Sequence, residues 1–159
     1  MEEKKLAIIA TKGTLDWGYP PFILASTAAA LGYETEIFFT FYGLQLLKKD
    51  LNLEVSPLGN PGMPMPMGMD KWFPVLGTAL PGMQAVMTSM MKKKMASKGV
   101  ASLEELRELS QEADVKLIAC QMTVDLFEMD TSEFIDGVEY AGAARFFEFA
   151  GESDICLYI

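Results

Sequence analysis

The residue with the clearest capacity for chemistry is Cys120, one of two cysteines among 159 residues. It follows the apolar run 115–119, which predicts a buried strand, and it precedes a short predicted helix over 121–127. In an open α/β sheet, ligands bind outside the carboxyl ends of the strands. Backbone N–H groups of Gln121 and Met122 and the positive end of a helix favour the thiolate, the nucleophilic form of cysteine. The sequence therefore predicts a reactive thiol at Cys120.

A second interpretation of Cys120 is an inert, buried thiol, because free cysteine is among the most often buried residue types. The other cysteine, Cys156, lies inside the apolar run 155–159 and is expected to pack in the core as a small hydrophobic side chain. The two cysteines stand 36 positions apart (156 − 120), which matches neither a metal-ligand spacing nor a Cys-x-x-Cys redox pair. We therefore expect no bound metal and no cofactor.

The loop after the first predicted strand is the candidate opposite wall of the Cys120 pocket. Lys12 can place a cation near a thiolate or an anionic substrate, and free N–H groups around Gly13 and Thr14 can bind an anion. The stretch is not a Walker A motif, because Gly18 is followed by Tyr-Pro and not by Lys-Ser or Lys-Thr. The alternative is an ordinary strand-to-helix turn that carries a solvated lysine.

Composition argues against several classes of function. The chain has no histidine, which removes Ser-His-Asp and Cys-His catalysis within the chain and the commonest ligand of zinc, copper and iron. A net charge of -9 argues against nucleic-acid binding, which needs a basic face. The amino terminus leads into too few apolar residues for a signal peptide, so we expect a cytoplasmic protein with a free thiol at Cys120.

Hydrophobic patterning predicts the elements that hold these residues in place. Short apolar or β-branched runs predict strands at 5–10, 34–40, 53–56, 115–119 and 155–159. Helices are expected at 19–31, 43–49, 83–95, 102–112, 121–127 and after an Asp130 cap, where Ile135, Val138, Gly142, Phe146 and Phe149 share one stripe. Strands that alternate with helices predict a single α/β domain over 1–159, with a mostly parallel sheet and helices on both faces.

The stretch 57–82 differs in composition from the rest of the chain. It holds six of the eight prolines and four methionines, so we expect a Met/Pro-rich loop insertion without regular helix or strand. The neighbouring run 72–91 carries no charge, but prolines and glycines interrupt it. Neither a bilayer span nor an interfacial membrane contact is therefore expected. Packing within the domain or against another subunit is the favoured interpretation.

Several short segments, taken in their order along the chain, resemble one known family. They are Lys12-Gly13-Thr14-Leu15-Asp16, Tyr19-Pro20-Pro21, Phe38-Phe39-Thr40-Phe41-Tyr42-Gly43, Pro81-Gly82-Met83 and Ala119-Cys120-Gln121-Met122. The family is that of the DsrE/DsrF-like sulfurtransferases, and the nearest branch carries the names DsrE-like and peroxiredoxin-like. A peroxide-reducing cysteine needs its own surrounding motif, and the sequence contains no such motif.

The resemblance implies a small Rossmann-like α/β fold and a homo-oligomer, often a trimer or hexamer. Members of the family hold sulfane sulfur on a cysteine as a persulfide or thiosulfonate, and Cys120 matches that cysteine. The leading hypothesis is a sulfur carrier or sulfurtransferase, in which Cys120 takes sulfur from a donor and passes it to an acceptor thiol on a protein or small molecule. Five residues are expected to line its pocket: Lys12, Gly13, Thr14, Gln121 and Met122. The alternative is a non-catalytic scaffold, or a module that binds a small anion or nucleotide, with an inert Cys120.

Overall fold

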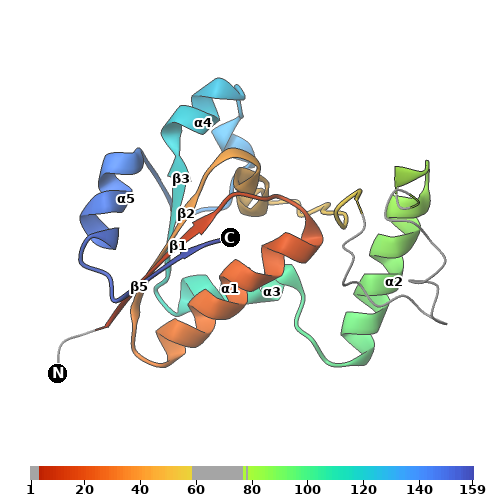
Figure 1. Cartoon of the computed structure of the whole chain (residues 1–159), viewed down its shortest axis with the longest axis horizontal. Helices are drawn as coiled ribbons and strands as arrows, with labels where there is room; N and C mark the ends of the chain where they lie inside the picture. Colours follow the sequence, from red (N-terminus) through yellow and green to blue (C-terminus); the bar gives the residue numbers. More distant parts are fainter. Residues whose placement is uncertain (1–3, 59–76, 78) are drawn as a thin grey trace. The chain divides into compact units, whose positions relative to one another are not determined.

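The computed structural model describes residues 4–58, 77 and 79–159 of the chain (Figure 1). Most of the predicted Met/Pro-rich loop, 57–82, lies outside the described residues. The chain divides into two compact units. The first unit consists of Met1–Gly13, Trp17–Asn52 and Leu103–Ile159, and the second of Thr14–Asp16 and Leu53–Ser102. The expectation of one domain over 1–159 stays a prediction.

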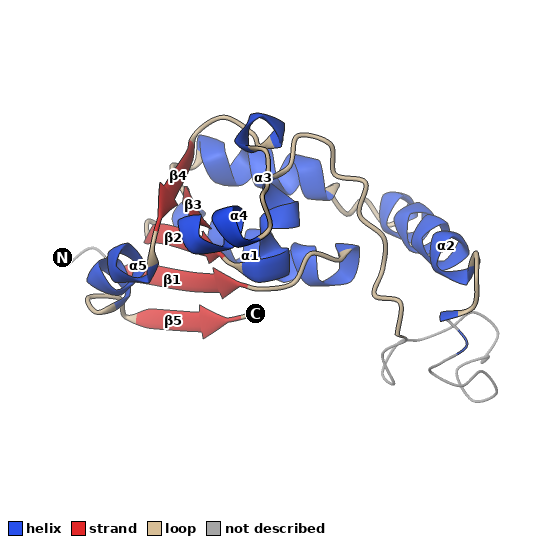
Figure 2. Ribbon diagram, turned by 90° about the horizontal axis from the view of Figure 1, so that it is seen from above, coloured by secondary structure: helices blue, strands red, loops and turns tan. Residues whose placement is uncertain are grey.

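The first unit is built on a five-stranded sheet in which every strand pairing is parallel. The strands are β1 (Lys5–Ala10), β2 (Glu34–Phe39), β3 (Lys116–Cys120), β4 (Val138–Ala141) and β5 (Ile155–Tyr158). They lie in the order β4-β3-β2-β1-β5, and Figure 2 shows the arrows of β1 and β5 pointing the same way. Strands buried inside a parallel sheet have nearly continuous apolar sequences, which is why hydrophobic runs predicted most of them. The predicted α/β class is confirmed.

Helices cover both faces of this sheet, as expected. The chain contains α1 (Leu15–Ala30), α2 (Met83–Ser97), α3 (Leu103–Glu112), α4 (Gln121–Leu126), α5 (Ala143–Ala150) and the 3-10 helices η1 (Phe41–Leu47) and η4 (Thr131–Glu133). Figure 1 shows α5 on one side of the strands and α1 and α3 on the other. The connections from β1 to β4 step across the sheet in one direction, whereas the chain returns through α5 to place β5 beside β1. Right-handed crossovers in opposite directions put helices on opposite faces.

The helix predicted after Asp130 is wrong over most of its length. Asp130 does cap a turn, because its side chain accepts a hydrogen bond from Ser132 N at 2.9 Å, but that turn is the short η4. The chain then forms β4 beside β3, and only α5 is helical. The apolar stripe fitted a helix by spacing, but pairing with β3 decides the conformation, since strand formation depends more on neighbours than on local propensity.

A buried cluster joins α5 to the sheet. Its members are Ala7, Phe38, Ile118, Cys120, Phe146 and Phe149. The rings of Phe38 and Phe146 lie 5.2 Å apart, a separation that suits tilted aromatic packing. The cluster therefore extends the core of this face to the carboxyl end of β3, where Cys120 lies.

A buried carboxylate on the same face is neutralised by an arginine fork. Glu36 in β2 is only 1% exposed. Arg145 of α5 donates to its two carboxylate oxygens from Nη1 at 3.0 Å and from Nη2 at 2.9 Å. Lys116 Nζ lies farther away, 3.4 Å from Glu36 Oε1. The hydrogen bonds to Glu36 raise the pKa of Arg145, and the bidentate geometry fixes α5 against the strands.

Replacing Arg145 by methionine is expected to destabilise the fold by about 3 kcal/mol, because the carboxylate of Glu36 is left buried without its main partner. The control is Lys116→Met, which removes a half-exposed lysine and is expected to cost less than about 1 kcal/mol. Urea unfolding followed by circular dichroism measures both changes. Equal losses in the two variants would contradict this account of the ion pair.

The second unit contains α2 and the segment before the undescribed residues. The predicted strand at 53–56 is wrong, because this segment pairs with no strand. Its backbone is held instead by side chains: Val55 N donates to Thr88 Oγ1 at 3.0 Å, and Gln84 Nε2 donates to Val55 O at 2.9 Å. Within the part of the chain that the structure describes, no helix combines the length and apolar character that crossing a bilayer requires.

Candidate functional site

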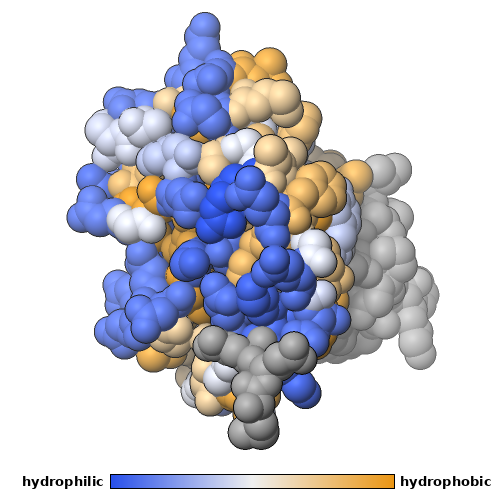
Figure 3. All heavy atoms as spheres, turned by 90° about the vertical axis from the view of Figure 1, so that its left-hand side faces the viewer, coloured by the Kyte–Doolittle hydropathy of each residue, from blue (hydrophilic) through white to orange (hydrophobic). Residues whose placement is uncertain are grey.

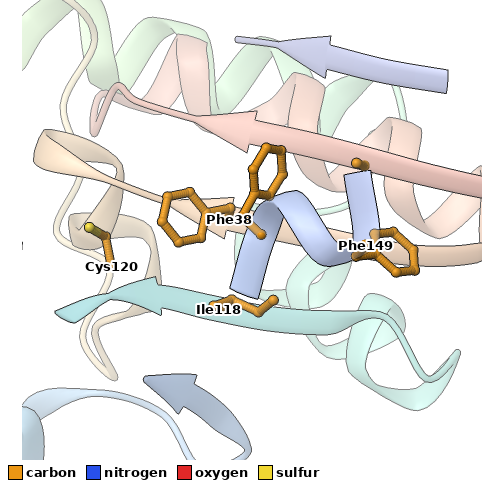
Figure 4. Close-up of a cluster of buried hydrophobic side chains, with 6 residues drawn as sticks. Phe38, Ile118, Cys120 and Phe149 are labelled. Carbon is orange, nitrogen blue, oxygen red and sulfur yellow. The ribbon is translucent and has the colours of Figure 1, made fainter. Parts of the chain in front are cut away.

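Cys120 is the last residue of β3 and the N-cap residue of α4, where the sequence predicted it. Figure 4 shows its side chain at one end of the buried cluster, opposite Phe149. The residue is only 4% exposed. A thiol in this position combines two environments, because it touches the apolar core on one side and the first turn of a helix on the other.

Polar groups around the sulfur favour its charged form. Burial raises the pKa of the Cys120 thiol, but the hydroxyl and backbone N–H of Thr123, the hydroxyl of Thr40 and the backbone N–H of Met122 lower it, and the net pKa lies below that of an unperturbed thiol. The Cys120 side chain makes no cap hydrogen bond to α4, and the N–H groups of Met122 and Thr123 lower its pKa as donors in the first turn of the helix. The thiol is therefore set up as a nucleophile without a histidine.

Two threonines complete this site, and the sequence reasoning missed both. Thr123 Oγ1 lies 3.2 Å from Thr40 Oγ1 and accepts a hydrogen bond from Phe41 N at 3.3 Å. A hydroxyl that accepts from Phe41 N keeps its own hydrogen to donate, either to Thr40 Oγ1 or towards the sulfur. Thr123 could have been identified from the sequence. It is the third residue after the N-cap residue Cys120, and the N–H of a residue in that position faces the cap side chain. Thr40 comes into the site only through the pairing of β2 with β3.

The two predicted residues after Cys120 have different surroundings. The backbone N–H of Met122 lowers the pKa of the Cys120 thiol, while the Met122 side chain is 64% exposed. The Gln121 side chain turns away and donates to Asp125 Oδ1 at 2.8 Å. Backbone support for the thiolate thus comes from Met122 and Thr123, one residue farther along α4 than the sequence suggested.

The predicted loop after β1 has its own contacts. Lys12 Nζ lies 3.2 Å from the centre of the Trp17 ring, a cation–π contact within the first unit. Gly13 packs against η1, since a Cβ there would overlap the carbonyl oxygen of Tyr42. Thr14 belongs to the second unit, and its Oγ1 is buried without a hydrogen-bond partner among the described residues. A role for these three residues at Cys120 stays a prediction.

Gly43 holds η1 close to the end of β1. A Cβ at Gly43 would overlap the carbonyl group of Ala10, so no larger residue fits without moving the backbone. This close approach fixes the start of η1, the segment that carries Phe41 and follows Thr40. Gly43 therefore helps to fix the position of Thr40, which pairs with Thr123 beside Cys120.

Replacing Gly43 by alanine is expected to destabilise the fold by about 1–3 kcal/mol, the usual cost of forcing atoms into a packed site. The matched control is Gly142→Ala, because a Cβ at Gly142 meets no atom within 4 Å; its cost should stay near or below 1 kcal/mol. Thermal unfolding measures both. A Gly43→Ala protein as stable as the control would show that η1 can shift freely.

The prediction that Cys156 is buried is wrong. It lies in β5, which is an edge strand, and its side chain is exposed. The buried cluster of the α5 face contains no β5 residue, so α5 leaves this strand uncovered. Three strand spacings of about 4.8 Å separate β5 from β3, which places the two cysteines beyond the ~7 Å Cα limit of a disulfide. Both thiols are free.

No group of three or more residues suited to a metal ion was found among the described parts of the chain. The sequence contains no histidine.

The chain is similar to known proteins over nearly its whole length. The chain is 85% identical over 159 residues, covering both chains fully, to the protein named sulfur carrier protein DsrE2 of Allochromatium vinosum. It is 33% identical over 164 residues to the protein YrkE of Bacillus subtilis, covering 99% of this chain and 98% of that protein. The crystal structure of the ychN protein of E. coli has the same fold, with a TM-score of 0.54 and 12% identity over 98% of this chain and 99% of that chain. Residues 2–158 match the model of one family, and the chain belongs to it: the DsrE/DsrF/DrsH-like family.

Proposed function

We propose that this protein is a sulfur carrier that holds sulfane sulfur on Cys120. The observation that carries the proposal is the position of Cys120 at the carboxyl end of β3 and the start of α4, where Thr123, Thr40 and Met122 lower the pKa of its thiol. The 85% identity to a protein named as a sulfur carrier supports the same function. The family membership of nearly the whole chain is consistent with it.

Loading of sulfur onto Cys120 requires no redox partner. The thiolate attacks the outer sulfur of a donor such as thiosulfate, a new S–S bond forms at Cys120, and the old S–S bond breaks with its electron pair leaving on sulfite. Charge balances, because a thiolate becomes an ionised persulfide while thiosulfate becomes sulfite. The protein needs only to keep Cys120 ionised and within reach of the donor.

Delivery repeats the same exchange in the opposite direction. An acceptor thiolate attacks the outer sulfur of the Cys120 persulfide, the bond between the two sulfurs breaks, and Cys120 leaves as a thiolate. Hydrogen bonds from Thr123 and Met122 stabilise that leaving group. The same groups that make Cys120 a nucleophile therefore make it a good leaving group.

Lys12, Gly13 and Thr14 are candidates, on sequence grounds, for holding an anionic donor. Lys12 would have to leave the Trp17 ring to do so. Gln121 would act only through its backbone, because its side chain is paired with Asp125.

The test is the intact mass of the reduced protein after exposure to thiosulfate or polysulfide. We expect a gain of one sulfur atom, located by peptide mapping on the segment that contains Cys120 and removed by dithiothreitol. Cys156 is the internal control, because it is the more exposed thiol. A protein that gains no sulfur, or gains it only at Cys156, would refute the proposal.

A second candidate is a scaffold of the same fold with an inert Cys120, which could bind a small anion or nucleotide at the carboxyl edge. The observation that favours it is the 4% exposure of Cys120 within the core cluster. Alkylation separates the two functions: a folded protein whose Cys120 resists both iodoacetamide and polysulfide at neutral pH supports the scaffold.

The proposed chemistry suggests a compartment, and the family resemblance suggests an assembly. A carrier whose thiol must stay reduced fits the cytoplasm, and family resemblance suggests a homo-oligomer, a trimer or hexamer. Its partners would be a sulfur donor and a thiol acceptor. Sedimentation velocity of the full chain measures the assembly, and a monomer would contradict that part of the proposal.

A further inference from the structure

The surface next to Cys120 is apolar and exposed. On α4, Thr123 and Val124 are buried, whereas Met122 and Leu126 are 64% and 60% exposed. Met122 and Leu126 are four positions apart, so they share one face of the helix. Figure 3 shows hydrophobic residues beside hydrophilic ones at the upper end of the molecule, where Figure 1 draws α4.

An aromatic patch, formed by Phe41, Tyr42 and Phe127, extends this surface. Tyr42 and Phe127 are stacked with ring centres 5.9 Å apart, and Phe41 meets both rings edge-on at 6.4 Å and 6.0 Å. All three residues are exposed, Tyr42 by 65%. Exposed aromatic residues grouped in this way are typical of protein interaction sites and not of ordinary surface.

The aromatic patch borders a pocket of about 430 Å³ with a negative rim. Its lining includes Tyr42 and Phe127 together with Lys48, Glu128, Asp130 and Glu133. One lysine against three carboxylates leaves an excess of two negative charges, and Lys48 is already paired with Glu133 at 2.9 Å. Hydrogen bonds from the Ser132 hydroxyl and N–H lower the pKa of Asp130, which stays ionised.

The patch is linked to the sulfur site through Thr123. Phe41 N donates to Thr123 Oγ1 at 3.3 Å, and Thr123 lowers the pKa of the Cys120 thiol. Thr123 is therefore shared by the patch and the surroundings of Cys120. A partner seated on Phe41 and α4 brings its own thiol to the carboxyl end of β3.

Charge argues against a twofold contact of the patch with a second copy of this chain. Such a contact would set Glu128, Asp130 and Glu133 of one copy against the same carboxylates of the other, in a chain whose net charge is -9. Like charges brought together at an interface cost free energy. A basic partner gains instead, because a lysine or arginine side chain can meet both the carboxylates and the stacked Tyr42 and Phe127 rings.

We propose that the aromatic patch and its acidic pocket are the docking surface for the sulfur acceptor, a protein whose reactive cysteine is flanked by basic and apolar residues. The inference rests on the proposed function and names the partner of that same site. The apolar residues of the partner cover Met122 and Leu126, and its basic side chain enters the pocket. Its thiolate then takes the outer sulfur from Cys120 by the exchange described above.

The test uses two synthetic acceptor peptides with one central cysteine each, one flanked by lysine and leucine and the other by glutamate and leucine. Full-length protein is loaded with polysulfide, and sulfur transfer to each peptide is followed by mass. We expect the lysine peptide to react about tenfold faster at low salt, because a charged site raises the encounter rate of an opposite charge. The ratio of the two rates should fall as salt is added.

Matched variants localise the effect to the pocket. Combining Glu128→Gln, Asp130→Asn and Glu133→Gln should bring the ratio of rates close to one, and Tyr42→Ala with Phe127→Ala should lower both rates together. Two controls should leave both rates, and so their ratio, as in the parent protein. The charge control combines Glu108→Gln, Glu112→Gln and Glu148→Gln, all exposed on α3 or α5, and the aromatic control is the exposed Phe147→Ala.

Three results would overturn the docking proposal. They are equal rates for the two peptides, a ratio that the triple carboxylate variant leaves unchanged, and an oligomer that Tyr42→Glu dissociates, which would mean that a second copy covers the patch. Failure of the proposed function looks different, because a protein without sulfur on Cys120 transfers none to either peptide or to 2-mercaptoethanol. In that case, binding of the same peptides to Cys120→Ser protein by fluorescence anisotropy still decides the docking surface.

Discussion

Replacing Cys120 by serine is expected to abolish sulfur loading completely. Serine fits the same space at the end of β3, but its hydroxyl does not ionise at neutral pH and so supplies no nucleophile. The measurement is intact mass after exposure to polysulfide, with the wild-type protein alongside. The fold should be retained, because the change replaces one small side chain by another.

Cys156→Ser is the matched control for this experiment. Cys156 is exposed on the edge strand β5 and three strands away from β3, so its loss should leave loading of the protein unchanged. A Cys120→Ser protein that still gains one sulfur, while Cys156→Ser gains none, would move the carrier function to β5. Loading of both single variants would mean that sulfur adds to any thiol of this chain without a site.

Thr123→Val is expected to slow sulfur loading about tenfold at neutral pH. Valine has the shape of threonine but lacks the hydroxyl that stabilises the thiolate. A hydrogen bond to a charged group is worth about 1.5–3 kcal/mol, and about 1.4 kcal/mol corresponds to a tenfold change in the thiolate fraction. Burial raises the pKa of Cys120, and the Thr123 hydroxyl no longer lowers it in the variant. The thiol therefore titrates at higher pH.

The pH profile distinguishes this effect from simple damage. Above the pKa of both proteins Cys120 is fully ionised, so the rate of Thr123→Val should rise to that of wild type or exceed it, since a thiolate of higher pKa is the better nucleophile. Thr123→Ser retains the hydroxyl and should keep the wild-type profile. A loss of the same factor at every pH would indicate a misplaced cysteine and would contradict the electrostatic role of Thr123.

The same pKa shift links the site to stability. The folded pKa of Cys120 lies below the unfolded value, so ionisation stabilises the fold. The contribution is fully present above the unfolded pKa and is lost as the pH falls through the folded pKa. Thr123→Val should therefore weaken the rise in stability that wild type shows between these two values.

The sequence alone determined the α/β class and the position of Cys120. Short apolar runs predicted the parallel strands β1, β2 and β3, and a cysteine at the end of such a strand lies at the carboxyl edge of the sheet. The family could also be identified from the order of short motifs. Local signals predicted the ends of helices less accurately than their existence. The helix α1 begins at Leu15, ahead of the predicted 19–31, and Pro20 and Pro21 lie inside it.

Only the tertiary structure decided which groups surround Cys120. Thr40 is 80 positions away in the chain (120 − 40) and reaches the sulfur because β2 pairs with β3, a choice that no local pattern encodes. Part of a predicted helix is instead the strand β4, because it pairs with β3. Cys156, which the apolar run predicted to be in the core, is exposed because its strand lies at the edge of the sheet. Local periodicity sets what a segment can bury, but its neighbours in the sheet determine whether anything covers it.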